Sequence, residues 1–392
     1  MKLLKRNLSV RLHEYLRIFP AVAIVGPRQA GKTTFAKMEL PEWRYFDLER
    51  PSDITRISAD IEFFLSQYGE HCIIDEAQNL PELFPALRNH IDRARDKKGR
   101  IVLLGSVNPL LMRNISESLT GRIGFIELGP FEYSEAAKGY GIDIEEYWLK
   151  GGYPEPLTWD TKGHTIWMEQ YIKTFVERDI FRLLKTSFSP QRQMQLLVML
   201  AHCHGMLWNA SQIGSAFGVS YHTVNNYVEL MESHFLIRRL IPYYQNIGKR
   251  LVKSPKFYYR DTGLLHYLLN ISDLEALRTS PYRGFSFEGL VIEQLLQKHS
   301  LSADGGVGYY FYRTAQGDEI DLLVQVNRQL HAYEVKASTS VELSELTGFQ
   351  RALNQLKLDK GVVVYFGKDN FNLNRQIEVK SAASLLKDFF ED

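Results

Sequence analysis

A glycine-rich segment near the N-terminus constrains the fold of this chain more than any other feature of its sequence. Residues 26–33 read GPRQAGKT and match the phosphate-binding loop pattern G-x-x-x-x-G-K-[ST]. The apolar run Ala21–Val25 precedes the loop, and the helix-compatible segment Thr34–Met38 follows it. This order of strand, loop and helix is the context that the motif requires. The sequence therefore predicts an α/β fold of the P-loop NTPase type.

The loop is suited to bind the phosphates of a nucleoside triphosphate. Its glycines let the backbone fold around the phosphates, so that N–H groups and the N-terminus of the following helix face the anion. Lys32 is expected to reach the β- and γ-phosphates, and the hydroxyl group of Thr33 to bind Mg²⁺. The predicted nucleotide-binding residues are Gly26, Pro27, Arg28, Gln29, Ala30, Gly31, Lys32, Thr33 and Thr34.

Two acidic residues end a second apolar run, His71–Glu76. Asp75 is predicted to hold the hydration shell of Mg²⁺, and Glu76 to polarise the water that attacks the γ-phosphate. The segment Trp43–Leu48, which lies between the two motifs, is predicted to form one more strand. An additional strand combined with a glutamate at this place is typical of ATPases that use a catalytic Glu.

Two later strands end or begin near polar residues that suit the same site. After the predicted strand 101–104, Ser106 or Asn108 is expected to orient the water, with Ser106 preferred; the alternative is that both cap the following helix. Arg122 precedes the predicted strand 123–128. It is predicted to stabilise charge on the γ-phosphate, either within its own chain or across a subunit boundary. The alternative is an ordinary surface arginine.

Several segments together resemble a family of bacterial and archaeal AAA-type ATPases with a C-terminal domain of uncharacterised function. These segments read GPRQAGKTT, IIDEAQNLPELFPALRNHID, LLGSVNPLLM, ESLTGRIGFIELGPFEYSEA and GGYPEP. The resemblance implies an ATPase core related to the signal-transducing and archaeal-type branch, with ATP as the nucleotide. It also implies that Arg122 and the turn 151–154 are nucleotide-site or interdomain elements. AAA-type cores often form rings, so a homo-oligomer is one expectation and a monomer is the other.

Length and composition limit the remaining possibilities. A chain of 392 residues is too long for one ordinary core. We predict an ATPase core over 1–150, a helical and winged helix-turn-helix region over 151–275 and a restriction-endonuclease-like domain over 276–392, with the Gly- and Pro-rich segment 151–156 as a hinge. The net charge of +1 gives no global electrostatic reason to bind nucleic acid. With two distant cysteines, no secretory start and no long apolar run, a cytoplasmic protein that does not enter membranes is expected.

The middle of the chain predicts helices and a strand pair. An amphipathic helix is expected over 165–184, where Arg178 either reaches the nucleotide or lies on a solvated helix face. A helix-turn-helix is expected over 209–235, with Gly218 in the turn and Ser220 as an N-cap. Segments 236–244 and 255–259 are expected to pair as a wing.

This region also predicts a DNA-binding surface. His222, Asn225 and Asn226 lie on the second helix, where they are placed to contact a groove or the DNA backbone. Basic residues gather in and around the predicted wing: Arg238, Arg239, Lys249, Arg250, Lys253, Lys256 and Arg260. The alternative is that the module docks proteins or acts as a lid on the ATPase.

A second group of chemically active residues lies near the C-terminus. Glu334 and Lys336 are two residues apart on a predicted strand, so they share a face. Asp321 from the neighbouring strand and Glu288 near the first turn of a helix are predicted to complete a site for Mg²⁺ or Mn²⁺. Lys336 would position a water molecule or stabilise charge on phosphate. The order and spacing of Asp321, Glu334 and Lys336 resemble the restriction-endonuclease-like superfamily, which implies metal-dependent nuclease chemistry; an acid–lysine pair on a solvated strand face is the alternative.

Three functional hypotheses follow. In the first, ATP turnover controls a nuclease that acts on DNA. In the second, the chain is a regulatory ATPase whose C-terminal half docks proteins and cuts nothing. In the third, it is a nucleotide switch that hydrolyses ATP very slowly.

Overall fold

The chain folds into two compact units. The computed structural model describes all residues except 1, 107–118, 181–187, 245–251, 303–305 and 388–392. Unit 1 comprises Met1–Phe131 together with Ser233–Phe235, and unit 2 comprises Glu132–Glu232 and Leu236–Asp392. None of the helices described is both long and apolar enough to cross a membrane.

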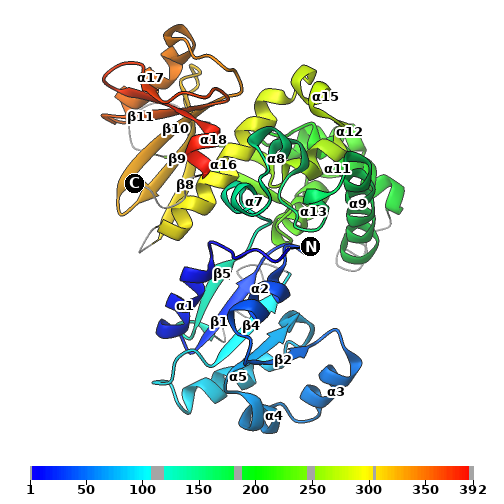
Figure 1. The fold of residues 1–392 in the computed structure, drawn as a ribbon. Helices are drawn as coiled ribbons and strands as arrows, with labels where there is room; N and C mark the ends of the chain where they lie inside the picture. The colour runs from blue at the N-terminus through cyan, green and yellow to red at the C-terminus, as the bar shows by residue number, and fades with distance from the viewer. Residues whose placement is uncertain (1, 107–118, 181–187, 245–251, 303–305, 388–392) are drawn as a thin grey trace. The chain divides into compact units, whose positions relative to one another are not determined.

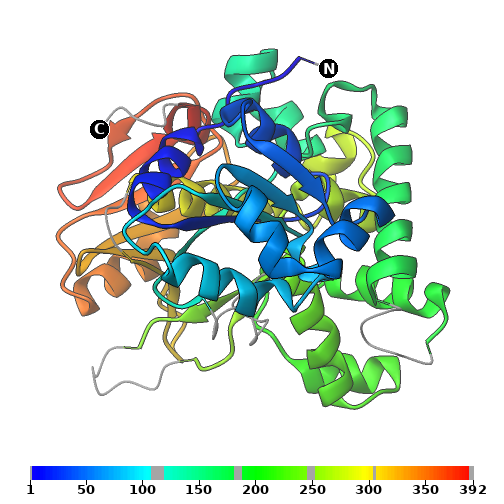
Figure 2. The same ribbon diagram turned by 90° about the horizontal axis from the view of Figure 1, so that it is seen from below.

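Unit 1 is built on a five-stranded parallel sheet. Its strands are β1 (Ala21–Val25), β2 (Arg44–Asp47), β3 (Cys72–Asp75), β4 (Ile101–Gly105) and β5 (Ile123–Glu127), in the order β2-β3-β4-β1-β5. Every residue of β1 is buried, as expected when helices cover both faces of a parallel sheet. These helices are α1 (Ser9–Ile18), α2 (Lys32–Glu39), α3 (Pro51–Ala59), α4 (Ile61–Tyr68) and α5 (Leu83–Asp92), drawn in blue to cyan in Figures 1 and 2. The five strands predicted from the sequence are confirmed.

The parallel arrangement brings the ends of several strands to one edge of this sheet. Val25 pairs with Gly105 in register, and Asp47 pairs with Asp75. One strand, β4, separates the strand that precedes the phosphate loop from the strand that ends in Asp75. The loop and the acidic residues therefore meet at the carboxyl edge, which is where ligands bind in open α/β sheets.

The N-terminal half of unit 2 is helical. Its helices are α7 (Tyr133–Tyr140), α8 (Ile144–Lys150), α9 (Thr161–Thr174), α11 (Pro190–Ala201), α12 (Ala210–Phe217), α13 (Tyr221–Ser233), α14 (Thr262–Leu268) and α15 (Leu274–Thr279), with short 3₁₀ and π segments η3 (Pro156–Thr158) and η4 (Phe175–Ile180). The helix predicted over 165–184 begins earlier, at Thr161, and changes to a π-helix at Phe175. Residues 181–187 and the side chain of Arg178 lie outside the described part of the chain.

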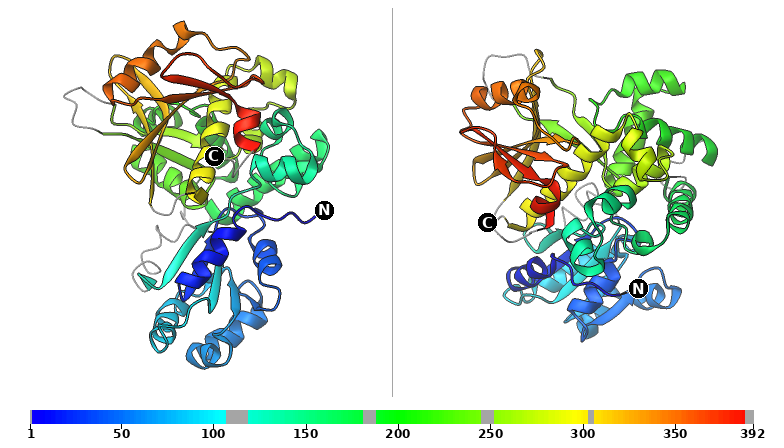
Figure 3. Two further views of the ribbon diagram at one scale, coloured as in Figure 1. Left: turned by 60° about the vertical axis from the view of Figure 1, so that its left-hand side comes forward. Right: turned by 45° about the horizontal axis from the view of Figure 1, so that its top comes forward.

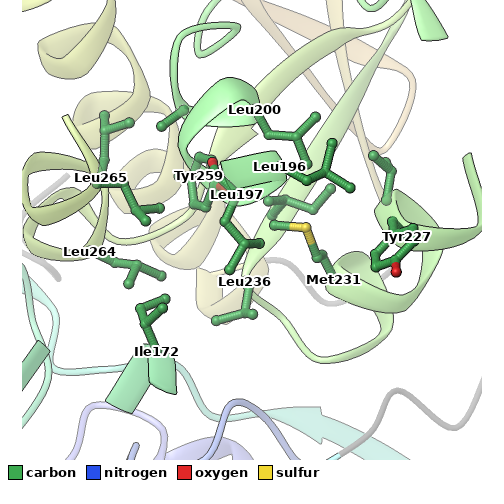
Figure 4. Close-up of a cluster of buried hydrophobic side chains, with 14 of the residues drawn as sticks. Ile172, Leu196, Leu197, Leu200, Tyr227, Met231, Leu236, Tyr259, Leu264 and Leu265 are labelled. Atoms are coloured by element: carbon green, nitrogen blue, oxygen red, sulfur yellow. The ribbon is translucent and has the colours of Figure 1, made fainter. Parts of the chain in front are cut away.

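An apolar cluster holds α9, α11, α12, α13 and α14 together. Side chains from α9, α11, α13 and α14 meet there, and Figure 4 shows Leu196, Leu197 and Leu200 of α11 facing Met231 and Leu264. Such a cluster is the expected result of apolar residues that recur every three or four positions. The turn between α12 and α13 is also as predicted: Gly218 adopts φ +71°, and Ser220 Oγ accepts the N–H of Thr223 at 3.1 Å.

The segment 151–156 is not a hinge. Gly151 and Gly152 are buried within unit 2, and the N–H of Gly152 donates to Asp261 Oδ2 at 2.8 Å. Gly151 has φ +73°, and a β-carbon there would lie 2.3 Å from Asp261 Oδ1. Glycine and proline serve a buried turn in this segment, so the hinge prediction is wrong.

The C-terminal half of unit 2 contains an eight-stranded mixed sheet. Its strands are β6 (Ile237–Pro242), β7 (Lys256–Tyr259), β8 (Val307–Arg313), β9 (Glu319–Val326), β10 (Gln329–Lys336), β11 (Gly361–Tyr365), β12 (Phe371–Asn372) and β13 (Ile377–Ser381), in the order β12-β13-β11-β10-β9-β8-β6-β7. The predicted strand pair forms, with Ile237 opposite Tyr259. Because β6 also pairs with β8, the pair is one end of this sheet and not a separate wing.

Three helices accompany this sheet: α16 (Arg283–Ser302), α17 (Thr347–Gln355) and α18 (Ala382–Lys387), with a 3₁₀ turn η5 (Leu343–Leu346) before α17. Figure 3 shows α16, in yellow, against the orange strands β9 and β10. The sequence predicted Glu288 near the first turn of a helix. Helix α16 begins earlier, at Arg283, so Glu288 lies in its second turn.

Candidate nucleotide site and carboxylate cluster

The phosphate loop is shaped by its two glycines. Gly26 adopts φ +157°, and a β-carbon there would lie 2.0 Å from the carbonyl oxygen of Leu128, so only glycine fits. Gly31 adopts φ +90° and is the N-cap of α2, whose first residue is Lys32. The loop therefore passes directly into a helix N-terminus, the arrangement that binds phosphate.

Lys32 is buried at the start of α2. Its Nζ atom donates to the carbonyl oxygens of Gly26 and Pro27, both at 2.9 Å. Burial lowers the pKa of Lys32 to about 8, although the negative charges of Glu76 and Asp75 act in the opposite direction. Because its partners are neutral carbonyl groups, this ammonium group would gain from an anionic ligand.

The residues predicted to hold Mg²⁺ are in contact. Thr33 Oγ1 donates to Asp75 Oδ2 at 2.6 Å, across 42 positions of sequence. Tyr45, on β2, donates to the same oxygen at 2.8 Å. Burial and the neighbouring Asp75 raise the pKa of Tyr45 well above its ordinary value, so its hydroxyl group stays a donor. A hydroxyl and a carboxylate oxygen are ligands that Mg²⁺ prefers, so these residues fit the ion.

Glu76 is held by two polar side chains. Ser106 Oγ donates to Glu76 Oε2 at 3.0 Å, and Gln78 Nε2 donates to the same oxygen and to Ser106 Oγ. Glu76 has φ +49°, a left-handed conformation that non-glycine residues seldom adopt and that is frequent at functional sites. The structure thus brings together Lys32, Thr33, Asp75, Glu76 and Ser106; Asn108 lies outside the described residues.

Three residues that contact this site were not predicted from the sequence. Tyr45 and Gln78 contact the acidic residues directly. Arg6 is buried and donates to the carbonyl oxygens of Ala30 in the phosphate loop (3.1 Å) and of Gly129 and Pro130 (both 2.9 Å). Nothing in the local pattern around these residues distinguishes them from ordinary strand, turn or surface positions.

Arg122 does not belong to the nucleotide site of its own chain. It precedes β5, and its carbonyl oxygen accepts the N–H of Ala21, at the start of β1. The phosphate loop follows the end of β1, at the opposite edge of the sheet. The guanidinium group of Arg122 instead forms two bonds with Asp92, at 2.7 and 2.8 Å. The structure therefore does not bring Arg122 to the phosphate loop of its own chain, and its predicted role in hydrolysis stays a prediction.

The second predicted site also converges. Lys336 Nζ donates to Glu334 Oε1 at 2.8 Å, as expected for two residues on the same face of β10. Asp321, on β9, accepts the N–H of Val335 at 3.0 Å. Burial, followed by the charge of Asp321, raises the pKa of Glu334 to about 8 and that of Glu288 to about 7.

A lysine that we assigned to the wing occupies the centre of this cluster. Lys256 Nζ lies 2.8 Å from Glu288 Oε1, 2.7 Å from Glu319 Oε1 and 3.1 Å from Asp321 Oδ1. Burial alone would lower the pKa of Lys256, but these carboxylates outweigh it and hold the pKa well above its ordinary value. Among the described residues, no group of three or more acidic, His or Cys side chains is arranged to hold a metal. As they stand, Glu288, Asp321 and Glu334 do not fit the Mg²⁺ or Mn²⁺ that the sequence predicts.

The basic wing is largely neutralised. Arg238 and Arg260 bind the buried carboxylate of Glu293, and Arg239 binds Glu232. Lys253 is exposed, whereas Lys249 and Arg250 lie outside the described residues. On α13, His222 and Asn226 are exposed, and Asn225 accepts the indole N–H of Trp208 at 3.1 Å. The predicted concentration of free positive charge is therefore not present among the described residues of β6 and β7.

Comparison with known proteins places this chain in a family. A model described as "AAA domain" matches residues 19–137, and models described as "Domain of unknown function (DUF8612)" and "Domain of unknown function (DUF4143)" match residues 141–275 and 283–385. "Uncharacterized protein Rv2008c" of Mycobacterium tuberculosis is 36% identical over 386 residues, which is 97% of this chain and 84% of the relative. The chain belongs to the same family as this protein. "Uncharacterized protein Mb2031c" of Mycobacterium bovis matches with the same identity and coverage.

Two solved structures show weaker similarity to this chain. The Walker-type ATPase PABY2304 of Pyrococcus abyssi has a TM-score of 0.46 and 17% identity, with 69% of this chain and 99% of that chain covered. The RuvB Holliday junction branch migration motor of Thermotoga maritima has a TM-score of 0.30 and 16% identity, covering 59% and 88%. The match to the AAA model and the geometry of the loop agree that unit 1 carries a P-loop AAA domain.

Proposed function

We propose that this protein binds ATP with Mg²⁺ in unit 1 and hydrolyses it. The observation that carries this proposal is the meeting of Lys32, the Thr33–Asp75 pair and the Glu76–Ser106 pair at one edge of the sheet. Lys32 would exchange its two carbonyl partners for the β- and γ-phosphates. Thr33 and Asp75 would hold Mg²⁺, which when bound neutralises charge on these phosphates.

Glu76 would act as the base. It accepts a proton from a water molecule while that water attacks the γ-phosphorus, and the bond to the bridging oxygen breaks to release ADP. Ser106 and Gln78 already bind Glu76 Oε2, so they would set the direction of its carboxylate. The left-handed backbone of Glu76 is consistent with a residue held for its function.

The test compares ATP binding and hydrolysis in Lys32→Ala, Glu76→Gln and a matched control, Glu82→Gln. Glu82 is exposed and lies at the start of α5. We expect Glu76→Gln to bind ATP as the wild type does and to hydrolyse it about 10²- to 10⁴-fold more slowly, the usual effect of losing a general base. Lys32→Ala is expected to lose ATP binding. Normal hydrolysis by Glu76→Gln would refute this mechanism.

For the C-terminal half we propose the regulatory alternative, in which the nuclease-like domain does not cut. The supporting observation is Lys256, whose ammonium group lies where the carboxylates would need a metal. Labelled single- and double-stranded DNA incubated with ATP and either Mg²⁺ or Mn²⁺ should remain intact. Cleavage by the wild type that disappears in Glu334→Ala would restore the nuclease hypothesis. DNA binding through α13 stays a prediction.

A further inference from the structure

The carboxylate cluster of unit 2 receives its cation from a different part of the chain. Glu288, Glu319 and Asp321 lie within the segment matched over 283–385. Lys256 lies within the segment matched over 141–275 and reaches them from β7. All three distances from its Nζ atom are between 2.7 and 3.1 Å. The two matched segments are therefore joined by one buried ionic group.

We propose that the ammonium group of Lys256 is the permanent cation of this cluster and takes the place of a divalent metal. The inference rests on the second part of the proposed function, a C-terminal domain that does not cut, and it supplies the physical reason. It does not depend on ATP hydrolysis in unit 1.

The position of Lys256 is fixed by its strand. Only 4% of its side chain is exposed. Lys256 pairs with Leu240 of β6, and two residues later, on the same face of β7, Tyr258 donates to Glu288 Oε1 at 2.5 Å. Lys256 and Tyr258, two residues apart on one strand, thus bind the same carboxylate. If the ammonium group of Lys256 moved away, the buried carboxylates would be left without their cation. Breaking a buried ion pair in this way is strongly destabilising, because it leaves a buried charge without a partner.

The same oxygen atoms would be needed by a metal. A divalent ion requires several oxygen ligands at about 2.0–2.6 Å. Glu288 Oε1 and Asp321 Oδ1 are bound to Lys256, Asp321 Oδ2 accepts a backbone N–H, and Glu334 Oε1 accepts from Lys336. Among the atoms described, Glu334 Oε2 is buried and has no hydrogen-bond partner. Glu319 is also occupied, by Lys256 through Oε1 and by Arg313 through Oε2. Carboxylates that already bind an ammonium group make a poor metal site.

The inference predicts that removing the lysine creates a metal site. Lys256→Met removes the charge and leaves a flexible, unbranched side chain, so Glu288, Glu319 and Asp321 lose the cation that pairs them and repel one another until another cation binds. We would titrate the full chain, free of nucleotide, with Mn²⁺ and follow free Mn²⁺ by electron paramagnetic resonance. Lys253→Met, an exposed lysine three positions earlier, is the matched control.

We expect Lys256→Met to bind one more Mn²⁺ ion per chain than the wild type or Lys253→Met, at least tenfold more tightly than any site in these two. This site should disappear in the double variant Lys256→Met/Glu334→Gln. A folded Lys256→Met chain that binds no additional Mn²⁺ would overturn the inference, as would a site in the wild type that Glu334→Gln removes.

If Lys256→Met does not fold, the wild type decides. The melting temperature of the wild type should be the same in EDTA and in Mn²⁺, and so should that of Glu334→Gln. A rise in Mn²⁺ that Glu334→Gln abolishes overturns the inference. Because none of these measurements uses ATP, a failed ATPase assay leaves the result unaffected, and DNA cleavage that depends on Glu334 would contradict the functional proposal separately.

Discussion

Removing the hydroxyl group of Tyr45 tests how the proposed nucleotide site holds Asp75, the carboxylate that we propose binds Mg²⁺. Tyr45 Oη donates to Asp75 Oδ2 at 2.8 Å, the same oxygen that accepts from Thr33 Oγ1. When Thr33 turns to Mg²⁺, Tyr45 can continue to hold Asp75 in place. Tyr45→Phe removes this donor and keeps the ring, over which Lys37 Nζ lies at 3.5 Å from the centroid.

The expected magnitude follows from the type of bond. A hydrogen bond to a charged group contributes about 1.5–3 kcal/mol. Tyr45 is only half-buried, so water can replace part of the lost interaction and the lower end applies. A loss of about 1.5 kcal/mol corresponds to about a tenfold change in an equilibrium constant.

The assay is steady-state ATP hydrolysis over a range of Mg²⁺ concentrations at saturating ATP. We expect Tyr45→Phe to need about tenfold more Mg²⁺ for half-maximal activity, with unchanged ATP binding in EDTA. Tyr68→Phe is the control, because its hydroxyl group contacts Arg56 and no residue of the site. A Mg²⁺ dependence of Tyr45→Phe within twofold of the wild type would refute the reasoning, as would an equal change in Tyr68→Phe.

Three other results are expected. ATP affinity should fall as the pH rises above about 8, because burial lowers the pKa of Lys32 to about 8 and the neutral amine does not attract phosphate. The dissociation constant for ATP should therefore differ between pH 7 and pH 9 in the wild type and be the same at both pH values in Lys32→Arg. Gly151→Ala should lower the urea-unfolding free energy of unit 2 by about 3 kcal/mol or more, because φ +73° with ψ −161° is a conformation that only glycine adopts easily and because a β-carbon would also displace Asp261. Gly141→Ala, at φ +73° and ψ +20° with no atom within 4 Å, should cost only the left-handed strain of about 1–2 kcal/mol. Equal losses would contradict this. Arg122→Ala should hydrolyse ATP at the wild-type rate at protein concentrations where the chain is monomeric, because Asp92 holds the Arg122 guanidinium group within its own chain. A loss above tenfold that appears only at higher protein concentration would support action across a subunit boundary.

The meeting of polar residues at one edge of the unit 1 sheet was predictable because it follows a rule of topology. Parallel strands end at one edge, so polar residues directly after apolar runs must meet there. Thr33, Asp75 and Ser106 are far apart in sequence and come together for this reason alone. Tyr45 was not predicted as a site residue because its contact with Asp75 depends on the register of β2 against β3, which no local sequence pattern reveals.

The errors in unit 2 share a cause. Arg238, Arg260 and Lys256 were counted as surface charge, yet each binds a carboxylate at least 32 positions away in sequence. In the same way, Gly151 and Gly152 look like a hinge in the sequence, but Asp261, more than a hundred residues later, accepts the N–H of Gly152 and lies close against Gly151. A sequence shows how much charge a segment carries, but only the fold shows whether that charge is already paired.

The two buried lysines show why this distinction decides function. Both lie near acidic residues, and the sequence suggested a phosphate partner for each: the nucleotide for Lys32 and, through the basic wing, DNA for Lys256. Lys32 is bound by two neutral carbonyl groups and its pKa is lowered, so the chain alone stabilises its positive charge poorly. An anionic ligand would stabilise the charged form of Lys32. Lys256 is bound by three carboxylates and its pKa is raised, so its charge is already satisfied and an added anion would be repelled. The partners of each lysine therefore support the proposals of a ligand-binding lysine in unit 1 and a structural ionic centre in unit 2.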